Sequence, residues 1–233
     1  KDMKKQGNTY TFLYSVVLVV VVAALLSIVS LSLQPRQNEN RQNEKRQNIL
    51  SAIHISSTAA NSAELFDKYI KEQFIINSKG DRIEGKAFDV NIEKQYNLPV
   101  EKRELPVFVA NVDGATKYIL PIYGAGLWGP IWGYISLDDN KDTVYGTYFS
   151  HASETPGLGA EIAGQHFQDE FLGKKTLENG EIALGVVKNG KVEKPDYQVD
   201  GISGGTITSV GVDAMLKACL NSYKSFLTNN DEE

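Results

Sequence analysis

Residues 200–209 read Asp-Gly-Ile-Ser-Gly-Gly-Thr-Ile-Thr-Ser, and a helical pattern of apolar residues follows them directly. In that pattern the apolar side chains recur at three-to-four spacing and form one stripe: Val212, Met215, Leu216, Cys219, Leu220, Tyr223 and Phe226. Glycines and small hydroxyl residues before a helix suit an anion, because the unpaired N–H groups and the helix dipole both attract negative charge. The stretch therefore predicts a phosphate-binding turn. Its simpler alternative is a glycine loop with a Ser or Thr N-cap.

Two further segments are rich in glycine. Residues 123–133 read Tyr-Gly-Ala-Gly-Leu-Trp-Gly-Pro-Ile-Trp-Gly, and residues 151–162 read His-Ala-Ser-Glu-Thr-Pro-Gly-Leu-Gly-Ala-Glu-Ile. The first segment predicts either a close approach of backbone and ligand, with Trp stacking on a ring, or a turn with Trp in the core. In the second, Pro156-Gly157 predicts a turn. His151 is a candidate general base or a strand-end histidine with an ordinary hydrogen bond.

Residues 200–209 do not match a P-loop, and the sequence shows no catalytic set of residues. No Gly-Lys-Ser/Thr follows the glycines, so the stretch is not a P-loop. A membrane-tethered hydrolase is a weak hypothesis, because no set of nucleophile, base and orienting group is visible.

The N-terminal part has the composition of a membrane segment. From Tyr10 to Leu33 no residue is charged, and about 20 apolar residues suffice for a helix to span the hydrocarbon core. We expect a retained anchor rather than a buried soluble helix or a signal peptide, for which the stretch is too long and lacks a small-x-small cleavage site. Basic residues flank both ends: Lys1, Lys4 and Lys5 on one side, Arg36, Arg41, Lys45 and Arg46 on the other. The positive-inside rule therefore leaves the side of the following domain open.

A polar stretch follows the apolar one. Residues 34–48 contain Arg-Gln-Asn three times, which predicts a solvated helix or stalk rather than a binding repeat. Residues 49–74 are also helix-compatible, because one apolar stripe runs through them: Leu65, Phe66, Tyr69, Ile70 and Phe74. We therefore expect a membrane segment over 1–34, a helical stalk over 35–75 and one folded domain over 76–233.

Beyond Arg103 the hydrophobic period shortens toward two, which is typical of strands. The expected strands are 108–112, 117–123, 131–137, 144–150 and 182–187. Asn189-Gly190 between Val187 and Val192 predicts a hairpin turn. With the terminal helix, these strands predict one α+β domain with a C-terminal helix, preceded by a single transmembrane helix.

Composition excludes several classes of function. The chain has 233 residues and a formal net charge of -5, which argues against binding nucleic acid. One Cys and three His argue against a disulfide framework and against a metal or iron–sulfur site built from this chain alone. Cys219 lies on the apolar stripe, so we predict a buried core thiol rather than a redox thiol.

Residues 200–206 resemble the motif Asp-x-x-Ser/Thr-Gly-Ala-Thr of the FMN-binding family whose members carry the flavin covalently. Together with the two glycine-rich segments, the anchor and the polar stalk, they resemble the C subunits of sodium-translocating NADH:quinone reductases over essentially the whole chain. One position departs from the motif, because Gly205 stands where the family usually has Ala. A less pre-organised loop is expected there.

The resemblance implies that Thr206 carries FMN through a phosphoester bond, with Thr208 and Ser203 as fallback hydroxyls. A separate Mg-dependent flavin transferase would make the bond and recognise the motif, including Asp200. The resemblance also implies cofactor neighbours: Ser203, Gly204, Ile207 and Thr208 at the phosphate and ribityl chain, Glu154, Thr155 and Leu158 from the proline turn, Leu127 and Trp128 beside the ring, and Lys188 near the flavin. A cation at Lys188 would favour anionic reduced flavin. The alternative for Lys188 is an exposed hairpin lysine.

The same resemblance implies an electron-transfer subunit with no substrate of its own. Electrons would arrive from a neighbouring iron–sulfur centre and leave to another flavin in a sodium-pumping NADH:quinone oxidoreductase. The chain would be anchored in the inner membrane with its domain on the periplasmic side. Two alternatives are the G subunit of the related ion-translocating ferredoxin:NAD oxidoreductase and a non-redox anchored domain that binds a phosphorylated ligand.

Overall fold

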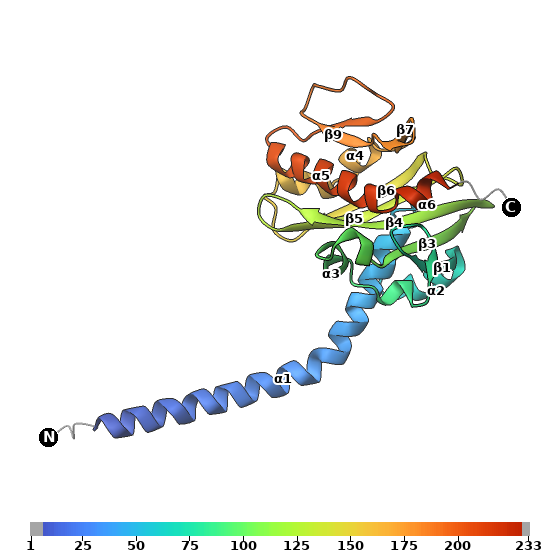
Figure 1. Ribbon diagram of the computed structural model, residues 1–233. Coiled ribbons are helices and arrows are strands. Elements are labelled where there is room, and N and C mark those ends of the chain that lie inside the picture. Colours follow the sequence, from blue (N-terminus) through green and yellow to red (C-terminus); the bar gives the residue numbers. More distant parts are fainter. Residues whose placement is uncertain (1–6, 230–233) are drawn as a thin grey trace. The chain divides into compact units, whose positions relative to one another are not determined.

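The computed structural model describes residues 7–229 (Figure 1). The chain separates into two compact units, residues 1–44 and residues 45–233. The basic residues on the N-terminal side of the apolar stretch lie outside the described residues: Lys1, Lys4 and Lys5.

The first unit contains most of a long helix, α1 (Asn8–Ser51). Its apolar side chains from Tyr10 to Leu33 are exposed, and an 18-residue window in it has a mean hydropathy of 3.0. By length and composition the helix can cross a membrane, which is compatible with a single-pass anchor. The helix continues through the Arg-Gln-Asn repeats, where most side chains are exposed, as expected of a solvated helix.

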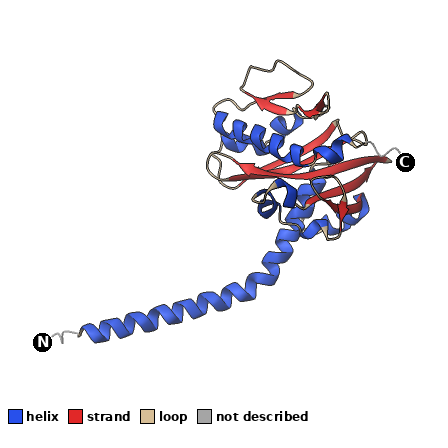
Figure 2. Ribbon diagram, viewed as in Figure 1, coloured by secondary structure: helices blue, strands red, loops and turns tan. Residues whose placement is uncertain are grey.

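The second unit is built on one antiparallel sheet with strand order β2-β1-β3-β4-β5-β6 (Figure 2). Its strands are β1 (Ile70–Ile76), β2 (Arg82–Ile83), β3 (Leu105–Val112), β4 (Ala115–Ala125), β5 (Pro130–Leu137) and β6 (Val144–His151). The four strands expected between residues 108 and 150 are confirmed. Each is longer than its alternating pattern, because pairing with neighbours extends its ends.

The helix expected over 49–74 is wrong for much of its length. Helix α1 ends at Ser51, α2 covers only Ser62–Tyr69, and residues 70–76 form strand β1 against β3. The run Ile75-Ile76 explains the difference, because Ile75 enters the core on one face of the sheet and Ile76 the core on the other. Consecutive residues buried on opposite faces are a strand property, and this long-range pairing overrides the local helical spacing.

Each face of the sheet has its own hydrophobic core. On one face lie α5 (Thr206–Ser222) and α6 (Lys224–Thr228), and the expected stripe of the terminal helix is buried there. The other core includes Phe66 of α2 and four residues at or just after the end of α1: Ile49, Leu50, Ala52 and Ile53. Short helices α3 (Ile92–Tyr96) and α4 (Gln165–Asp169) complete the layers. The terminal helix is therefore held by packing along its length, with Gly211 against Ala125 at the end of β4.

The hairpin expected at Asn189-Gly190 is wrong. A turn forms there, with Gly190 at φ 72°. However, β9 (Gly185–Val187) pairs in parallel with β10 (Gln198–Asp200), and no strand begins at Val192. The strand expected over 182–187 is also interrupted, because Ile182 ends β8 (Glu181–Ile182), which pairs with β7 (Leu177–Glu178). The parallel partner β10 leads directly into residues 200–206.

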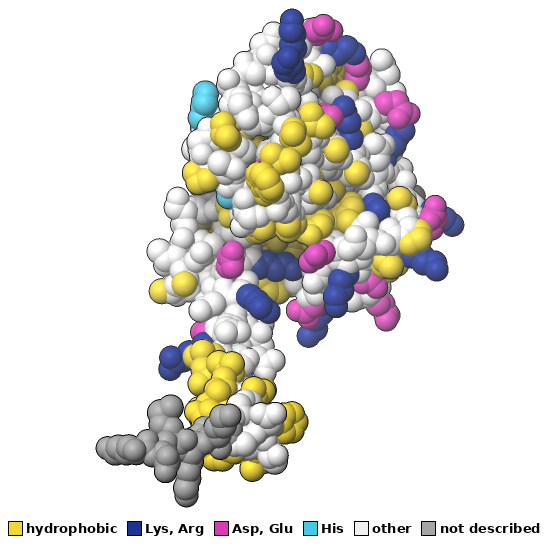
Figure 3. Space-filling view, turned by 90° about the vertical axis from the view of Figure 1, so that its left-hand side faces the viewer, with side chains coloured by type: hydrophobic (Ala, Val, Ile, Leu, Met, Phe, Trp, Pro, Cys, Tyr) yellow, Lys and Arg dark blue, Asp and Glu magenta, His cyan; other side chains and the backbone are white. Residues whose placement is uncertain are grey.

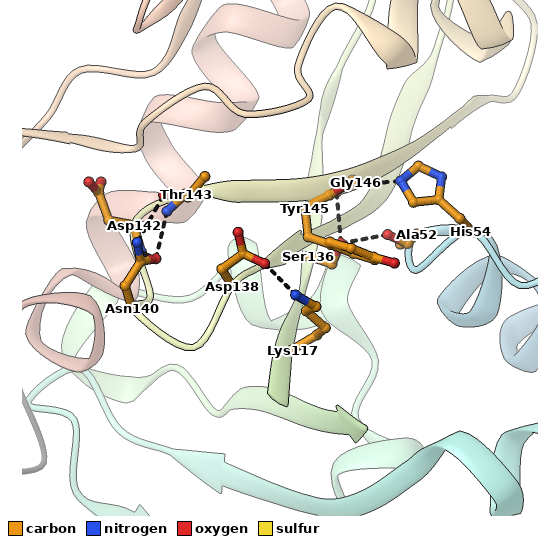
Figure 4. Close-up of polar contacts among 10 residues, drawn as sticks. All are labelled: Ala52, His54, Lys117, Ser136, Asp138, Asn140, Asp142, Thr143, Tyr145 and Gly146. Atoms are coloured by element: carbon orange, nitrogen blue, oxygen red, sulfur yellow. Dashed lines mark hydrogen bonds and ion pairs between the residues drawn. The ribbon is translucent and has the colours of Figure 1, made fainter. Parts of the chain in front are cut away.

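Polar contacts fasten the segment after α1 onto strands β5 and β6 (Figure 4). The hydroxyl of Ser136, fully buried, donates to the carbonyl oxygens of Ala52 at 2.5 Å and Gly146 at 3.0 Å. The ring nitrogen Nε2 of His54 lies 3.0 Å from the carbonyl oxygen of Tyr145. Buried polar groups need such partners, so this corner of the domain is rigidly joined to the sheet.

Cys219 is buried in α5, as expected from the stripe. Its thiol lies 3.3 Å from the carbonyl oxygen of Tyr123, and burial raises the pKa of the thiol to about 11. Because the thiolate is the reactive form, we expect no alkylation of the native protein by iodoacetamide at pH 8 and complete alkylation in denaturant. Mass spectrometry measures both states. Rapid native labelling would contradict the burial.

Candidate functional site

Thr206 occupies the first position of helix α5, and its side chain is exposed. The N–H of Ser209 is the first to meet a helical acceptor, the carbonyl oxygen of Gly205 at 2.9 Å. The preceding N–H groups of the first turn have no acceptor within the helix. An anion attached at Thr206 would therefore lie where these groups and the positive end of the helix dipole favour it. These residues fit a phosphoryl group.

The loop before Thr206 is held by a residue that the motif does not include. The hydroxyl of Ser209 accepts from the N–H of Ile202 at 2.9 Å and donates to the carbonyl oxygen of Gly205 at 2.9 Å. The side chain of Ser209 thus ties the loop at Ile202 to the first turn of the helix. No signal in the sequence separates Ser209 from the neighbouring hydroxyl residues, because its role depends on the loop conformation.

Two glycines of the loop lie in close packing, which is tighter at Gly201 than at Gly205. A Cβ at Gly201 would lie 2.6 Å from the carbonyl oxygen of Val187. A Cβ at Gly205 would lie 3.1 Å from Cγ2 of Ile202 and 3.2 Å from the carbonyl carbon of Leu158. The backbone of the proline turn thus presses on position 205, and the glycine there allows a close approach of the two segments.

The three candidate hydroxyls differ in access. Thr206 and Ser203 are exposed. Thr208 is 2% exposed, and its hydroxyl donates to Oε2 of Glu154 at 2.6 Å. A reaction with a large donor needs an accessible oxygen, so Thr208 is unsuited to attachment in the folded state.

Asp200 and Lys188 both lie at the turn beside the loop. Oδ1 of Asp200 accepts from the N–H of Gly190 at 2.7 Å, which ties the turn at 188–191 to the end of β10. A small pocket of about 40 Å³ lies beside it, with Lys188, Asn189, Thr206 and Val210 among its lining residues. Lys188 is exposed and lies on the same pocket as Thr206. Asn189 has no signal of a site residue in the sequence, because Asn-Gly predicts a hairpin turn.

Exposed apolar side chains surround the start of α5, and we call them the apolar patch: Leu127, Trp128, Leu158, Ile207 and Val210. Figure 3 faces the side of the domain on which α5 begins, and hydrophobic side chains gather on it. Trp128 is 65% exposed, so the alternative of a turn with this Trp in the core is wrong. Isolated exposed apolar residues are ordinary, whereas a group of them on one side of a domain is a candidate binding surface.

The proline turn carries Thr155, which is exposed, and Glu154, which is buried. The carbonyl oxygen of Thr155 accepts from the N–H groups of Leu158 and Ala160, both at 3.1 Å. His151 ends β6, and its Nδ1 accepts from the N–H of Glu154 at 3.2 Å. His151 is thus the strand-end histidine of the simpler alternative, not a base beside a nucleophile.

These segments contain two spacings known from functional motifs, but the surrounding structure is not the one that either motif requires. Residues 124–129 have the spacing Gly-x-Gly-x-x-Gly, but they join antiparallel strands β4 and β5 and open no helix, so they do not form a dinucleotide site. Residues 201–205 have the spacing Gly-x-Ser-x-Gly. Within residues 7–229 no histidine hydrogen bonds to Ser203, and His166 instead lies 3.9 Å from Glu170. In this same part of the chain no group of three His, Cys, Asp or Glu side chains is placed to hold a metal ion.

The comparisons with known proteins agree with this geometry. The family described as FMN-binding domain matches residues 126–221, a span that holds all the candidate site residues. The fold and the site thus define an FMN-binding domain behind an N-terminal apolar helix.

Similar proteins identify a narrower family than the FMN-binding domain. The crystal structure of the C subunit of Na(+)-translocating NADH-quinone reductase from Parabacteroides distasonis is 48% identical and superposes with a TM-score of 0.81, covering 85% of this chain and 98% of that one. The C subunit of the Vibrio vulnificus enzyme is 30% identical over 83% of each chain, and that of Haemophilus ducreyi is 29% identical over 99% of this chain and 92% of its own. The chain belongs to the family of C subunits of Na(+)-translocating NADH-quinone reductases. Its resemblance to this family is confirmed.

Proposed function

We propose that the chain carries FMN through a phosphoester bond to Thr206 and relays electrons inside a sodium-pumping NADH:quinone oxidoreductase. The observation that carries the proposal is the contrast between Thr206 and Thr208. Thr206 has an accessible hydroxyl at a helix N-terminus, whereas the hydroxyl of Thr208 is buried and bonded.

The polar half of the cofactor has suitable neighbours. The first turn of α5 contains no acidic residue, so its N–H groups are available to a phosphoryl group. Lys188 lies on the adjoining pocket, where a cation would stabilise negative charge on a phosphate or on a reduced flavin. Ser203 and Gly204 border the same loop and would approach the ribityl chain.

In this proposal the isoalloxazine ring of the FMN lies on the apolar patch. Trp128, Leu127 and Leu158 offer exposed apolar area on which an isoalloxazine ring can lie, and Trp128 can stack on it. The pocket beside Thr206 is much too small to enclose such a ring. A covalent tether fits this surface, because a ring bound on an open face would otherwise dissociate readily.

The flavin would supply the electron-transfer chemistry, and the residues of this chain would supply position and access. Threonine needs activation to act as a nucleophile, and within the described part of the chain no side chain hydrogen bonds to Thr206. We therefore propose that a separate Mg-dependent flavin transferase makes the bond. In this proposal the domain lies on the periplasmic side of the inner membrane, between an iron–sulfur subunit and a second flavin subunit.

Intact-mass spectrometry with peptide mapping tests the proposal on the chain purified from its native membrane. We expect an added mass of one FMN less one water on the peptide that contains Thr206, and flavin fluorescence of the denatured band in a gel. An unmodified Thr206 from cells with an active transferase would refute the electron-carrier function. That result would leave the non-redox anchored domain that binds a phosphorylated ligand.

Asp200 offers a second test. Asp200→Ala removes the acceptor of the Gly190 N–H bond, so we expect the turn at 188–191 to loosen and flavin attachment to fall several-fold. Asp200→Asn keeps an acceptor oxygen at the same place and should retain most of the attachment. In-gel flavin fluorescence per unit of protein measures both. Equal loss in both variants would assign the role to the charge, not to the turn.

A further inference from the structure

Glu154 is a buried carboxylate, 5% exposed, that joins two segments far apart in the sequence. Its Oε1 accepts from the backbone N–H of Trp128 at 2.8 Å, and its Oε2 accepts from the hydroxyl of Thr208 at 2.6 Å. Among residues 7–229 no Lys or Arg forms an ion pair with it, so these neutral donors are what satisfies the carboxylate. Hydrogen bonds to a charged group are among the stronger ones.

Glycines leave the space that this carboxylate occupies. A Cβ at Gly126 would lie 2.5 Å from Oε1 of Glu154. A Cβ at Gly159 would lie 2.5 Å from Oε2 and 2.3 Å from the hydroxyl oxygen of Thr208. Real Cβ atoms do not approach so closely, so both glycines are needed for the carboxylate to reach its two donors. The packing around Glu154 is thus built for this side chain.

The segments that meet at Glu154 are those that present the apolar patch. Trp128 and Leu127 belong to the turn between β4 and β5, Leu158 belongs to the proline turn, and Ile207 belongs to the first turn of α5. Glu154 itself is shielded, so it acts on this surface through Trp128 and Thr208. Thr208 is also only two residues from the proposed attachment point.

We propose that Glu154 is a positioning residue that locks the first turn of α5 and the two glycine-rich turns into one surface for the flavin. This inference rests on the proposed attachment of FMN to Thr206. The carboxylate has a second effect, because a buried negative charge near the flavin disfavours the extra negative charge of its reduced form. Glu154 therefore keeps the flavin ring in place and lowers its midpoint potential.

Two substitutions separate these effects. In Glu154→Gln the amide oxygen can still accept from Trp128 and the amide NH₂ can donate to Thr208, so the positions are kept and the charge is lost. We expect a higher midpoint potential and an unchanged flavin fluorescence anisotropy. In Glu154→Ala both contacts are lost, and we expect the anisotropy to fall as well. Glu161→Gln, at an exposed carboxylate near the same turn that accepts from Gly157 at 3.1 Å, is the matched control and should change neither value.

A readout without flavin keeps the test independent of the proposed function. In a Thr206→Val background we expect Glu154→Ala to speed hydrogen–deuterium exchange in the turn at residues 126–129, because the N–H of Trp128 loses its acceptor. If Glu154→Ala does not fold, Thr208→Val replaces it, and Thr208→Ser, which keeps the hydroxyl, should restore the wild-type values. Wild-type anisotropy, potential and amide exchange in Glu154→Ala would overturn the inference, as would shifts of equal size in Glu161→Gln. Absence of flavin from the wild type would instead refute the attachment.

Discussion

Replacing Thr206 by Val is expected to give a folded, membrane-bound chain without covalent flavin. Valine has nearly the shape of threonine and lacks only the hydroxyl, and position 206 is exposed, so stability should change by no more than about 0.5 kcal/mol. In-gel flavin fluorescence and the FMN mass on the peptide should both disappear. Thr206→Ser keeps an acceptor oxygen and should retain the flavin. NADH-driven quinone reduction in membranes should be lost with Val and kept with Ser.

The matched control is Thr208→Val, two residues along the same helix. It removes a hydroxyl that is buried and bonded to Glu154, so the carboxylate is left with an unsatisfied oxygen. We expect a loss of about 1–3 kcal/mol of unfolding free energy, with the flavin still attached. Flavin that persists in Thr206→Val and disappears in Thr208→Val would move the attachment to the buried hydroxyl and refute the argument from access.

The parts of the fold that the sequence could predict are those governed by local pattern. Strands β3 to β6 are rich in apolar residues because a core lies on each face of the sheet, and α5 shows a stripe because only one of its faces packs on the sheet. Strand β1 was missed because Ile70 and Phe74 continue the spacing of α2, and only pairing with β3 decides their conformation. Asn189-Gly190 does turn, but β10 supplies the partner strand from a later part of the chain.

The candidate site also has features that the sequence predicts and features that only the fold reveals. Thr206 stands out in the sequence because hydroxyl, glycines and helix start are contiguous. The two hydrogen bonds that Glu154 accepts could not be predicted, because their donors lie 26 and 54 residues away and only the fold brings them together. The exposure of Trp128 was equally hidden, since a tryptophan among glycines fits a core position as well as a surface one.

Replacing Gly211 by Val is expected to displace the first half of α5 and to reduce both stability and flavin attachment. A Cβ at position 211 would lie 2.4 Å from the carbonyl oxygen of Ala125, at the end of β4. Gly124 on that strand is equally close to the helix, because a Cβ there would lie 2.7 Å from Cβ of Met215. Helix and sheet therefore come into close contact in the first half of α5, the helix that begins at Thr206.

Two effects of opposite sign compete in Gly211→Val, and their magnitudes decide the outcome. Valine is a better helix former than glycine by roughly 0.3 kcal/mol, whereas overpacking costs about 1–3 kcal/mol and more against rigid backbone. We expect a net loss of about 2 kcal/mol, or roughly 4–8 °C in the melting temperature of a domain of this size. Ala214→Val, at an exposed position of the same helix, should cost only about 0.5 kcal/mol and leave the flavin signal intact. If Gly211→Val were as stable as wild type and fully flavinylated, close contact between helix and strand could not be what places Thr206.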